Sequence, residues 1–382
     1  MHEPNSKAAE DRQETLVSDR LLEPIWGSFE RLLGVPMSWI GTMTGKVVPV
    51  KRWLSLKDVP DDIGPCVVTI GNFDGVHRGH QAVLARLTAR AAAVGGTSVV
   101  ITFDPHPLAV LAPERAPVPV SSIEQRCVAL AELGVGAVLV LPFTKEFAAW
   151  SPERFVREVL VDSLHARVVV VGEDTRFGHR NSGDVNTLRE LGTGFGFEVE
   201  ALSDLGTTAG APVSAERRWS SSWVRELLGS GQVDQAAEVL GRYHRVTGTV
   251  VHGDHRGREL GYPTANLSQG SEGVIPADGV YAGWLVRPDR AENDPERCLP
   301  AAISVGTNPT FDGTQRRVEA YALDRTDLDL YGEPIGVDFV TLLRPTLRFD
   351  GIEALVKQMH EDVERCREVL IGATWPDSTA IR

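Results

Sequence analysis

Cysteine is scarce in this chain of 382 residues, and acidic residues outnumber basic ones. The formal net charge of −13 argues against a protein that binds nucleic acid by broad neutralisation of phosphates. That charge is still compatible with a small basic pocket for one nucleotide. The wide spacing of the four cysteines, with no C-x-x-C pair, makes a disulfide or zinc framework unexpected and fits a reducing cytosol: they are Cys66, Cys127, Cys298 and Cys366.

Long apolar runs are absent as well. No stretch approaches the roughly 20 residues of a membrane span, and the N-terminus lacks the charged-then-apolar pattern of a signal peptide. We therefore expect a cytoplasmic protein without nucleic-acid or membrane partners. The length favours two domains, and a hydrophobic content of 42% is typical of globular proteins. Composition does not determine the oligomeric state, so self-association stays open.

Residues 1–50 differ from the rest of the chain. Residues 1–15 are polar and predict disorder, and apolar residues then recur at helical spacing over 21–33. We interpret this segment as an N-terminal extension, either a short helix that packs on the next domain or sequence upstream of a later start codon. A helix that docks on a partner or a membrane is the alternative, although its polar face is acidic.

Strand-like and helix-like segments alternate from residue 51 to about residue 202. This alternation predicts a Rossmann-like α/β domain with a parallel sheet, in which ligands bind beyond the carboxyl ends of the strands. The expected strands are 66–70, 98–103, 137–141, 167–171 and 197–202, and the expected helices are 79–94, 122–133, 151–164 and 184–191.

Short β-rich runs separated by glycine and proline replace this pattern in the second half. They predict a small antiparallel β-barrel, followed by an amphipathic helix over 351–371. A loop of small residues over 206–215 and helices over 220–229 and 232–241 precede it. The expected barrel strands include 245–251, 280–286, 301–305, 317–323 and 337–343.

Residues 71–80, Gly-Asn-Phe-Asp-Gly-Val-His-Arg-Gly-His, carry the strongest chemical signal. They join an expected strand to an expected helix, so His77 and His80 lie where the helix begins. The unpaired N–H groups and the dipole of a helix start favour bound phosphate, and the glycines allow the backbone to approach a ligand. The segment predicts a nucleotide site. Helix capping and metal ligation are the alternatives, although no third ligand lies at a recognised spacing.

Ser221, Ser222 and Arg225 form a second motif at the start of the helix expected over 220–229. Serines at a helix start are ordinary N-caps. Hydroxyls, helix N–H groups and an arginine also suit the β- and γ-phosphates of a nucleotide. In combination with residues 71–80, they predict a nucleotidyltransferase site.

The two motifs together resemble the adenylyltransferase half of the bifunctional prokaryotic riboflavin kinase/FAD synthetase family. The family's H-x-G-H histidines correspond to His77 and His80, and its S-S-x-x-x-R element ends at Arg225. The resemblance implies that these three side chains stabilise the transition state when the phosphate of FMN attacks the α-phosphorus of ATP. It also implies nucleotide contacts at Gly71, Phe73, Asp74, Gly75, Ser221 and Ser222, and flavin contacts at Phe103, Pro105, His106 and Asp174.

Thr175 departs from the pattern of that family. The family usually reads G-E-N/D-F-x-F-G, whereas residues 172–178 read Gly-Glu-Asp-Thr-Arg-Phe-Gly. A side chain smaller than the usual aromatic would loosen packing beside the flavin or adenine pocket. The alternative is therefore a riboflavin kinase with a weakened or inactive adenylyltransferase domain. A flavin- or nucleotide-binding regulator without turnover is an alternative from another class.

Residues 248–267 carry a third motif, in which a glycine-rich loop leads to Thr264 and Asn266. The backbone N–H groups of such a loop can cradle phosphate, and the two side-chain oxygens suit Mg²⁺. A hairpin turn with polar capping is the alternative. The run resembles the riboflavin kinase signature of the same family, which implies a Mg²⁺ site at Thr264 and Asn266 and nucleotide contacts at Gly253, Gly257 and Gly261.

Glu319 lies in a β-like run over 317–323, shortly after the turn-forming sequence at 305–311. A carboxylate in such a run is most often a solvent-facing strand residue. The resemblance implies instead that Glu319 is the general base that accepts the proton of the ribityl hydroxyl. It also implies a flavin contact at Asn308.

The resemblance covers residues 51–370 and implies an enzyme with two activities. One phosphorylates riboflavin with Mg²⁺ and ATP to give FMN, and the other joins FMN to the AMP part of a second ATP to give FAD and pyrophosphate. The expected organisation is an N-terminal extension at 1–50, an adenylyltransferase domain at 51–241, a kinase domain with a six-stranded antiparallel barrel and a terminal helix at 242–373, and a tail at 374–382.

Overall fold

The computed structural model describes residues 50–203, 217–253, 257, 260–310 and 313–371. The helix expected over 21–33, the loop over 206–215 and the tail at 374–382 lie outside the described residues. Residues 49–382 form one packing unit, which contains every described residue. In these described segments, no helix is both long and apolar enough to cross a membrane.

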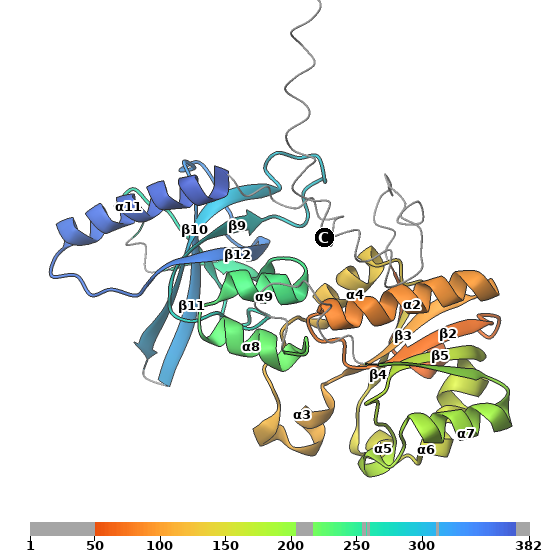
Figure 1. Ribbon diagram of the computed structural model, residues 1–382. Coiled ribbons are helices and arrows are strands. Elements are labelled where there is room, and N and C mark those ends of the chain that lie inside the picture. The colour runs from red at the N-terminus through yellow and green to blue at the C-terminus, as the bar shows by residue number, and fades with distance from the viewer. Residues whose placement is uncertain (1–49, 204–216, 254–256, 258–259, 311–312, 372–382) are drawn as a thin grey trace, which may run out of the picture. The chain divides into compact units, whose positions relative to one another are not determined.

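Six parallel strands form the first sheet, in the order β1-β4-β3-β2-β5-β6. Figure 1 labels the strands β2, β3, β4 and β5 of this sheet. All five expected strands are present, and the parallel α/β fold predicted for this half is confirmed. The additional strand, β1, has three residues at the edge of the sheet, too few to show a hydrophobic period. The strands are β1 Lys51–Trp53, β2 Cys66–Ile70, β3 Thr97–Asp104, β4 Ala137–Pro142, β5 Ala166–Gly172 and β6 Glu198–Leu202.

Helices cover both faces of this sheet because its strands are apolar on both sides. The side chains of Val67 and Val100 pack with α2 and α4, whereas those of Val68 and Ile101 pack with α6, η4 and α7. The helix expected over 151–164 is α6 continued as the π-helix η4. The helices of this half are α2 Arg78–Val94, α3 Pro107–Leu111, α4 Ile123–Glu132, α5 Lys145–Ala148, α6 Pro152–Phe155, η4 Val156–Ser163 and α7 Val185–Phe195.

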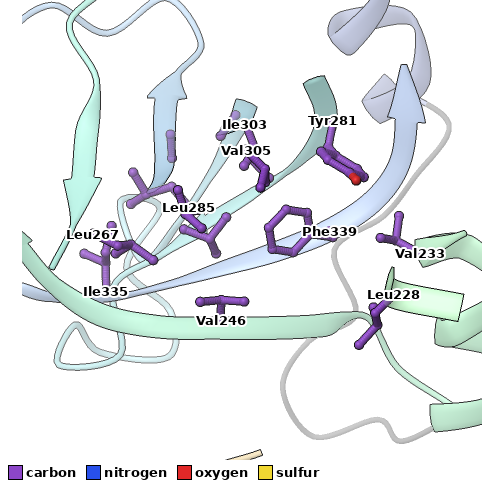
Figure 2. Close-up of a cluster of buried hydrophobic side chains, with 14 of the residues drawn as sticks. Leu228, Val233, Val246, Leu267, Tyr281, Leu285, Ile303, Val305, Ile335 and Phe339 are labelled. Carbon is purple, nitrogen blue, oxygen red and sulfur yellow. The ribbon is translucent and has the colours of Figure 1, made fainter. Parts of the chain in front are cut away.

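The second sheet is a closed antiparallel barrel with the strand order β10-β11-β8-β7-β12-β9. This confirms the six-stranded barrel expected for the second half. Its interior is filled by alternate apolar side chains, among them Val246, Leu285 and Phe339 (Figure 2). The strands are β7 His244–Val251, β8 Ala265–Leu267, β9 Gly279–Val286, β10 Cys298–Thr310, β11 Gly313–Ala322 and β12 Pro334–Pro345.

Two helices between the sheets, α8 (Ser221–Gly229) and α9 (Val233–Leu240), pack with the barrel. Leu228 and Val233 belong to the same buried cluster as Phe339 of the barrel (Figure 2). The N–H of Ala277, just before β9, also donates to the carbonyl of Leu228 at 2.9 Å. Because α8 begins with the serines of the second motif, part of the expected adenylyltransferase site rests on the core of the barrel.

The amphipathic helix predicted over 351–371 is present as α11 (Ile352–Ile371), and it covers the outside of the barrel. Val363, Cys366 and Leu370 pack on Ala282 of β9 and its neighbours. Arg344 of β12 donates to the carboxylate of Asp362, with the closest oxygen at 2.6 Å. The helix therefore closes the apolar outer face of β9.

Candidate active sites

The turn after β2 holds two non-glycine residues in the left-handed region, Phe73 at φ 48° and Val76 at φ 43°. Such conformations cost about 1–3 kcal/mol each and persist only where the surroundings impose them. Both side chains are buried, which supplies that constraint. Gly75 has φ +76°, and a β-carbon there would approach Val120 to 2.8 Å. The turn thus fixes the backbone that leads into the first motif's histidines.

His77 is the N-cap of α2, and its Nδ1 accepts a hydrogen bond from the N–H of His80 at 3.4 Å. The two imidazole rings are stacked, with their centroids 3.7 Å apart. A β-carbon at Gly79 would lie 3.2 Å from the ring of His77, so the glycine leaves room for that ring over the helix start. Helix capping, the alternative for these histidines, is therefore present for His77. The capping hydrogen bond occupies Nδ1 of His77 and leaves Nε2 as the donor of the neutral ring.

Both histidines are uncharged near neutral pH. Burial lowers the pKa of His77 to about 4, with Arg218 and Arg242 adding to the effect. Burial also lowers the pKa of His80 well below its usual range, and its Nδ1 is buried without a partner in the described part of the chain. Neutral imidazoles can donate hydrogen bonds to phosphate, whereas a full positive charge would have to come from arginine.

Acidification should destabilise the protein partly through His77. Because its folded-state pKa of about 4 lies below the ordinary value of 6.5, its contribution is present above pH 6.5 and is lost as the pH falls toward 4. By pH 5 the loss from this one group is about 2 kcal/mol. Urea unfolding of wild type and His77→Asn at pH 7 and pH 5 measures it, since asparagine also caps helices but does not titrate. An equal pH dependence in the two proteins would contradict the assignment.

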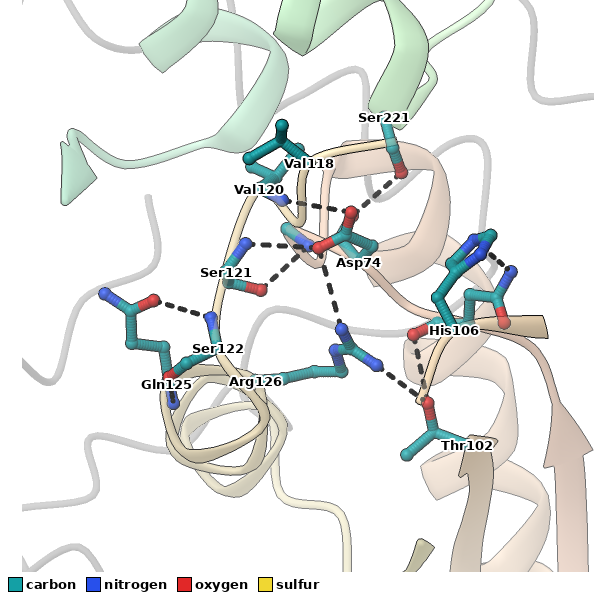
Figure 3. A network of polar contacts seen from close by, with 12 residues as sticks. Asp74, Thr102, His106, Val118, Val120, Ser121, Ser122, Gln125, Arg126 and Ser221 are labelled. Atoms are coloured by element: carbon teal, nitrogen blue, oxygen red, sulfur yellow. Dashed lines mark hydrogen bonds and ion pairs between the residues drawn. The ribbon is translucent and has the colours of Figure 1, made fainter. Parts of the chain in front are cut away.

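Asp74 connects the turn after β2 to two other segments (Figure 3). Its carboxylate accepts the N–H groups of Val120 at 3.0 Å and Ser121 at 3.1 Å. It also pairs with Arg225 and lies 3.6 Å from a guanidinium nitrogen of Arg126. The side chain is 4% exposed, so these protein donors surround it. Asp74 lines the cavity described below, but its carboxylate is engaged in holding the site together.

The start of α8 lies against the same turn. Ser220 caps the helix by accepting the N–H of Trp223 at 3.2 Å, while Ser221 Oγ donates to the carbonyl of Asp74 at 2.8 Å (Figure 3). Arg225 Nε donates to the carbonyl of Val118 at 2.6 Å, besides its pairing with Asp74. Residues from two distant segments, 71–80 and 220–225, are therefore joined in one place.

These residues surround a cavity of about 860 Å³ at the carboxyl ends of the sheet strands. Of the residues expected at the adenylyltransferase site, two, Gly75 and Pro105, are not among the described residues that line it. Phe103 reaches the cavity from the end of β3, His106 from the segment after β3, and Asp174 from the segment after β5. The others on its wall are Gly71, Phe73, Asp74, His77, His80, Ser221, Ser222 and Arg225.

His106 has two polar contacts that fix its ring. Its Nδ1 accepts the N–H of Leu108 at 3.1 Å, as the N-cap of α3, and its Nε2 lies 3.1 Å from the side-chain amide of Asn72. Burial lowers the pKa of His106, which favours the neutral ring. Asp174, on the opposite side of β2, pairs with Arg218 at 2.8 Å.

An aromatic wall was missed in the sequence. Phe143, Phe147 and Trp150 follow β4 and line the cavity together with Phe103. The ring of Phe147 lies 5.7 Å from that of Phe143 and 5.0 Å from that of Trp150. Aromatic faces of this kind suit a flat ring system. The rule that ligands bind beyond strand ends, applied to the strand at 137–141, would have found them.

The third and fourth motifs meet on the barrel. Asn266 of β8 is paired with Glu319 of β11, and both alternate with core residues, so their side chains share the outer face. Asn266 Nδ2 donates to the carbonyl and to Oγ1 of Thr264, each at 3.2 Å. Ser304 of β10 lies opposite Glu319 on its other side. The expected base and the expected metal ligands are therefore neighbours.

The glycines of the third motif are needed for close packing of the loop itself. A β-carbon at Gly253 would come within 2.6 Å of the side-chain amide of Asn266, and one at Gly257 within 2.5 Å of the carbonyl of Tyr262. Gly261 adopts φ +87°, which favours glycine. Residues 254–256 and 258–259 and the side chain of Asn308 lie outside the described parts.

Metal ligation by histidine, cysteine or acidic side chains is the alternative prediction for His77 and His80. In the segments that the structure describes, no group of three or more such side chains is placed to hold a metal ion. Thr264 and Asn266 offer neutral oxygens, a donor set of a different kind.

Comparison with known proteins gives two family matches. Residues 59–217 match the FAD synthetase family, and residues 240–370 match the riboflavin kinase family. The bifunctional riboflavin kinase/FMN adenylyltransferase of Escherichia coli K12 is 35% identical over 311 residues, which cover 81% of this chain and 94% of that protein. The protein of the same name from Pseudomonas fluorescens is 38% identical over 303 residues, covering 79% and 92%.

A solved structure with the same arrangement is that of a Streptococcus pneumoniae protein described as a macrolide-efflux protein. It superposes with a TM-score of 0.71 at 28% identity, covering 84% of this chain and 99% of that one. The similarity extends over both the parallel sheet and the barrel.

Proposed function

Since the chain belongs to the family of bifunctional riboflavin kinase/FMN adenylyltransferases, we propose how its residues divide the two reactions between two sites. The enzyme phosphorylates riboflavin to FMN and adenylylates FMN to FAD, each time with ATP. Residues 51–241 are assigned to the adenylyltransferase and residues 242–373 to the kinase. The observation that carries the assignment is the single cavity that His77, His80 and Ser221 line together.

In the adenylyltransferase site, the FMN phosphate attacks the α-phosphorus of ATP and pyrophosphate leaves. His77 and His80 act as neutral hydrogen-bond donors, and Arg225, whose charge is balanced by Asp74, is a further donor near the triphosphate. The N–H groups at the starts of α2 and α8 add to the stabilisation of negative charge. The aromatic wall and Asp174 surround the flavin. No covalent intermediate with the enzyme is required, because positioning and charge stabilisation are sufficient for in-line transfer.

In the kinase site, Glu319 accepts the proton of the ribityl hydroxyl as its oxygen attacks the γ-phosphorus of ATP, and ADP leaves. Thr264 and Asn266 suit Mg²⁺, a hard cation that takes oxygen ligands and keeps waters and substrate phosphates in its shell. The bonds from Asn266 Nδ2 to Thr264 orient the amide and leave Oδ1 for a cation. When bound, the ion neutralises charge on the phosphates of ATP.

Replacing Asn266 with alanine should raise the Mg²⁺ concentration that gives half-maximal FMN formation by about 10-fold or more. The substitution removes one proposed oxygen ligand and the amide that orients Thr264. FAD formation from supplied FMN, titrated with Mg²⁺ in the same preparation, is the control and should not shift. An unchanged Mg²⁺ requirement for the kinase step would place the cation elsewhere.

Thr175 bears on the alternative of a kinase with a weakened adenylyltransferase. It lines the cavity beside Phe177, and the aromatic residues after β4 supply the flat apolar wall from another side. This arrangement favours a working site. Chromatography of the flavins formed from riboflavin with Mg²⁺ and ATP tests both activities at once. FMN accumulating without any FAD, also when FMN is supplied, would favour the alternative, and riboflavin bound without turnover would favour a regulator.

A further inference from the structure

A short loop after β5, the 178–183 loop, is built rigidly at the edge of the adenylyltransferase cavity. Phe177 and Gly183 close it with two backbone hydrogen bonds of 3.1 and 3.0 Å. The N–H of His179 donates to the carbonyl of Trp150 at 2.7 Å. A β-carbon at Gly178, which has φ +72°, would come within 2.8 Å of Pro152. The loop is therefore closed at its base and held against residues 150–152.

Two consecutive residues of this loop, Arg180 at φ 53° and Asn181 at φ 57°, adopt the left-handed conformation. Glycine adopts this conformation without strain, whereas for arginine it is unfavourable in free energy. Both residues line the cavity. Packing alone does not explain why a strained backbone places Arg180 and Asn181 on the cavity wall, whereas a role in ligand binding does.

The charge balance of the cavity singles out Arg180. Four arginines and two aspartates line the cavity, and its three histidines have lowered pKa values. Arg218 pairs with Asp174, Arg225 pairs with Asp74, and Arg176 lies 3.4 Å from Asp184. Within the described chain, Arg180 has no hydrogen-bond or ion-pair partner. It is an uncompensated cation on the wall of a site in a protein whose net charge is −13.

The position of the loop connects that cation to the reaction. β5 is hydrogen-bonded to β2, so the segments that follow these two strands lie next to each other at the carboxyl edge of the sheet. The segment after β2 carries His77 and His80, and the segment after β5 carries Arg180. A guanidinium here would complement the phosphate oxygens of a bound substrate, for which arginine offers a planar fork of donors.

We infer that Arg180 is a phosphate-binding residue of the adenylyltransferase site, presented by the 178–183 loop, with Asn181 as its neighbour on the cavity wall. The inference rests on the proposed function and extends it. Two substrates carry the same chemistry, the monophosphate of FMN and the triphosphate of ATP. The guanidinium binds the phosphate group that lies beside the 178–183 loop, and the KM values for FMN and ATP distinguish the two substrates.

The test measures FAD formation from FMN and ATP with the full chain, using Arg180→Ala, Arg180→Lys and Arg180→Gly. Alanine removes the charge and keeps the backbone strain. We expect KM to rise about 10-fold for one substrate: for FMN if the monophosphate is bound, for ATP if the triphosphate is bound. Lysine should recover part of the loss. Glycine should bind as poorly as alanine while its Tm equals or exceeds that of wild type, because the strain is relieved.

Arg189→Ala is the matched control, since Arg189 is an exposed arginine on α7 that contacts Asn186 and does not line the cavity. FMN formation at the barrel, measured in each preparation, reports the amount of active kinase domain, and the Tm of each variant reports on folding. Unchanged KM values for both substrates in Arg180→Ala, or an equal rise in Arg189→Ala, would overturn the inference. A wild-type enzyme that makes no FAD would instead overturn the proposed function, so the two failures are distinguishable.

Discussion

Replacing Glu319 with glutamine is expected to lower the rate of FMN formation by about 10²–10⁴-fold, the range that a general base contributes. Glutamine keeps the size of the side chain and its place beside Asn266 and Ser304. It cannot accept the proton of the ribityl hydroxyl, so the attacking oxygen would have to lose that proton to water. The effect should fall on kcat more than on the KM for riboflavin, because the lost interaction belongs to the transition state.

FAD formation from supplied FMN is the internal control for Glu319→Gln and should remain at the wild-type rate. Glu272→Gln is a matched variant, since Glu272 is an exposed residue that pairs through its backbone with Thr247 of the same barrel. Rates of both steps can be followed by separating riboflavin, FMN and FAD. A decrease of less than about 10-fold in FMN formation would mean that another group is the base.

Replacing Asp74 with asparagine should abolish FAD formation and lower the free energy of unfolding by about 3–5 kcal/mol, the cost of breaking a buried ion pair. The carboxylate accepts N–H groups from the segment before α4 and pairs with Arg225 of α8, with Arg126 close by. The neutral amide leaves these guanidinium groups without a counter-charge. One end of the amide also presents N–H donors to atoms that themselves donate.

Urea unfolding and FAD formation together test this expectation. Glu158→Gln is a suitable control, because Glu158 pairs with Arg154 at 2.7 Å on an exposed helix surface, where such pairs contribute less than about 1 kcal/mol. Activity should be measured at a temperature where Asp74→Asn is still folded. A variant as stable and as active as wild type would show that Asp74 has no part in joining the turn to α8.

Much of the fold could be predicted because its signals are local. The five longer strands of the sheet and the helix at 351–371 follow from hydrophobic period alone. β1 and β8 have three residues each, too few for a period to appear. The π-helix η4 could not be predicted, because apolar residues at 156–160 fit an α-helix equally well.

The site was predictable where its residues form a contiguous motif, as at 71–80. The sequence does not show which side chains bind one another in the folded protein. Asp74 was expected at the nucleotide, but its carboxylate is surrounded by protein donors. The pKa of His77 depends on burial and on Arg218 and Arg242, which are far away in the sequence. The backbone strain at Arg180 likewise has no signature in composition.

The packing of α8 and α9 on the barrel couples the adenylyltransferase site to the kinase domain. Leu227, Leu228 and Leu240 are buried in the barrel's cluster, and each such side chain stabilises the fold by about 1.5–3 kcal/mol. A gene divided at the 241/242 boundary would expose them, a large fraction of the roughly 5–15 kcal/mol that keeps a domain folded. The adenylyltransferase half would then lose the support for Ser221 and Arg225.

The kinase half would keep Thr264, Asn266 and Glu319, which lie on its own strands and loops. The barrel residues that pack with the two helices, Tyr281 and Phe339 among them, would be exposed by the same cut. Covalent linkage of the two halves is therefore part of the adenylyltransferase scaffold, because the helix that carries Ser221 and Arg225 is buried against the barrel.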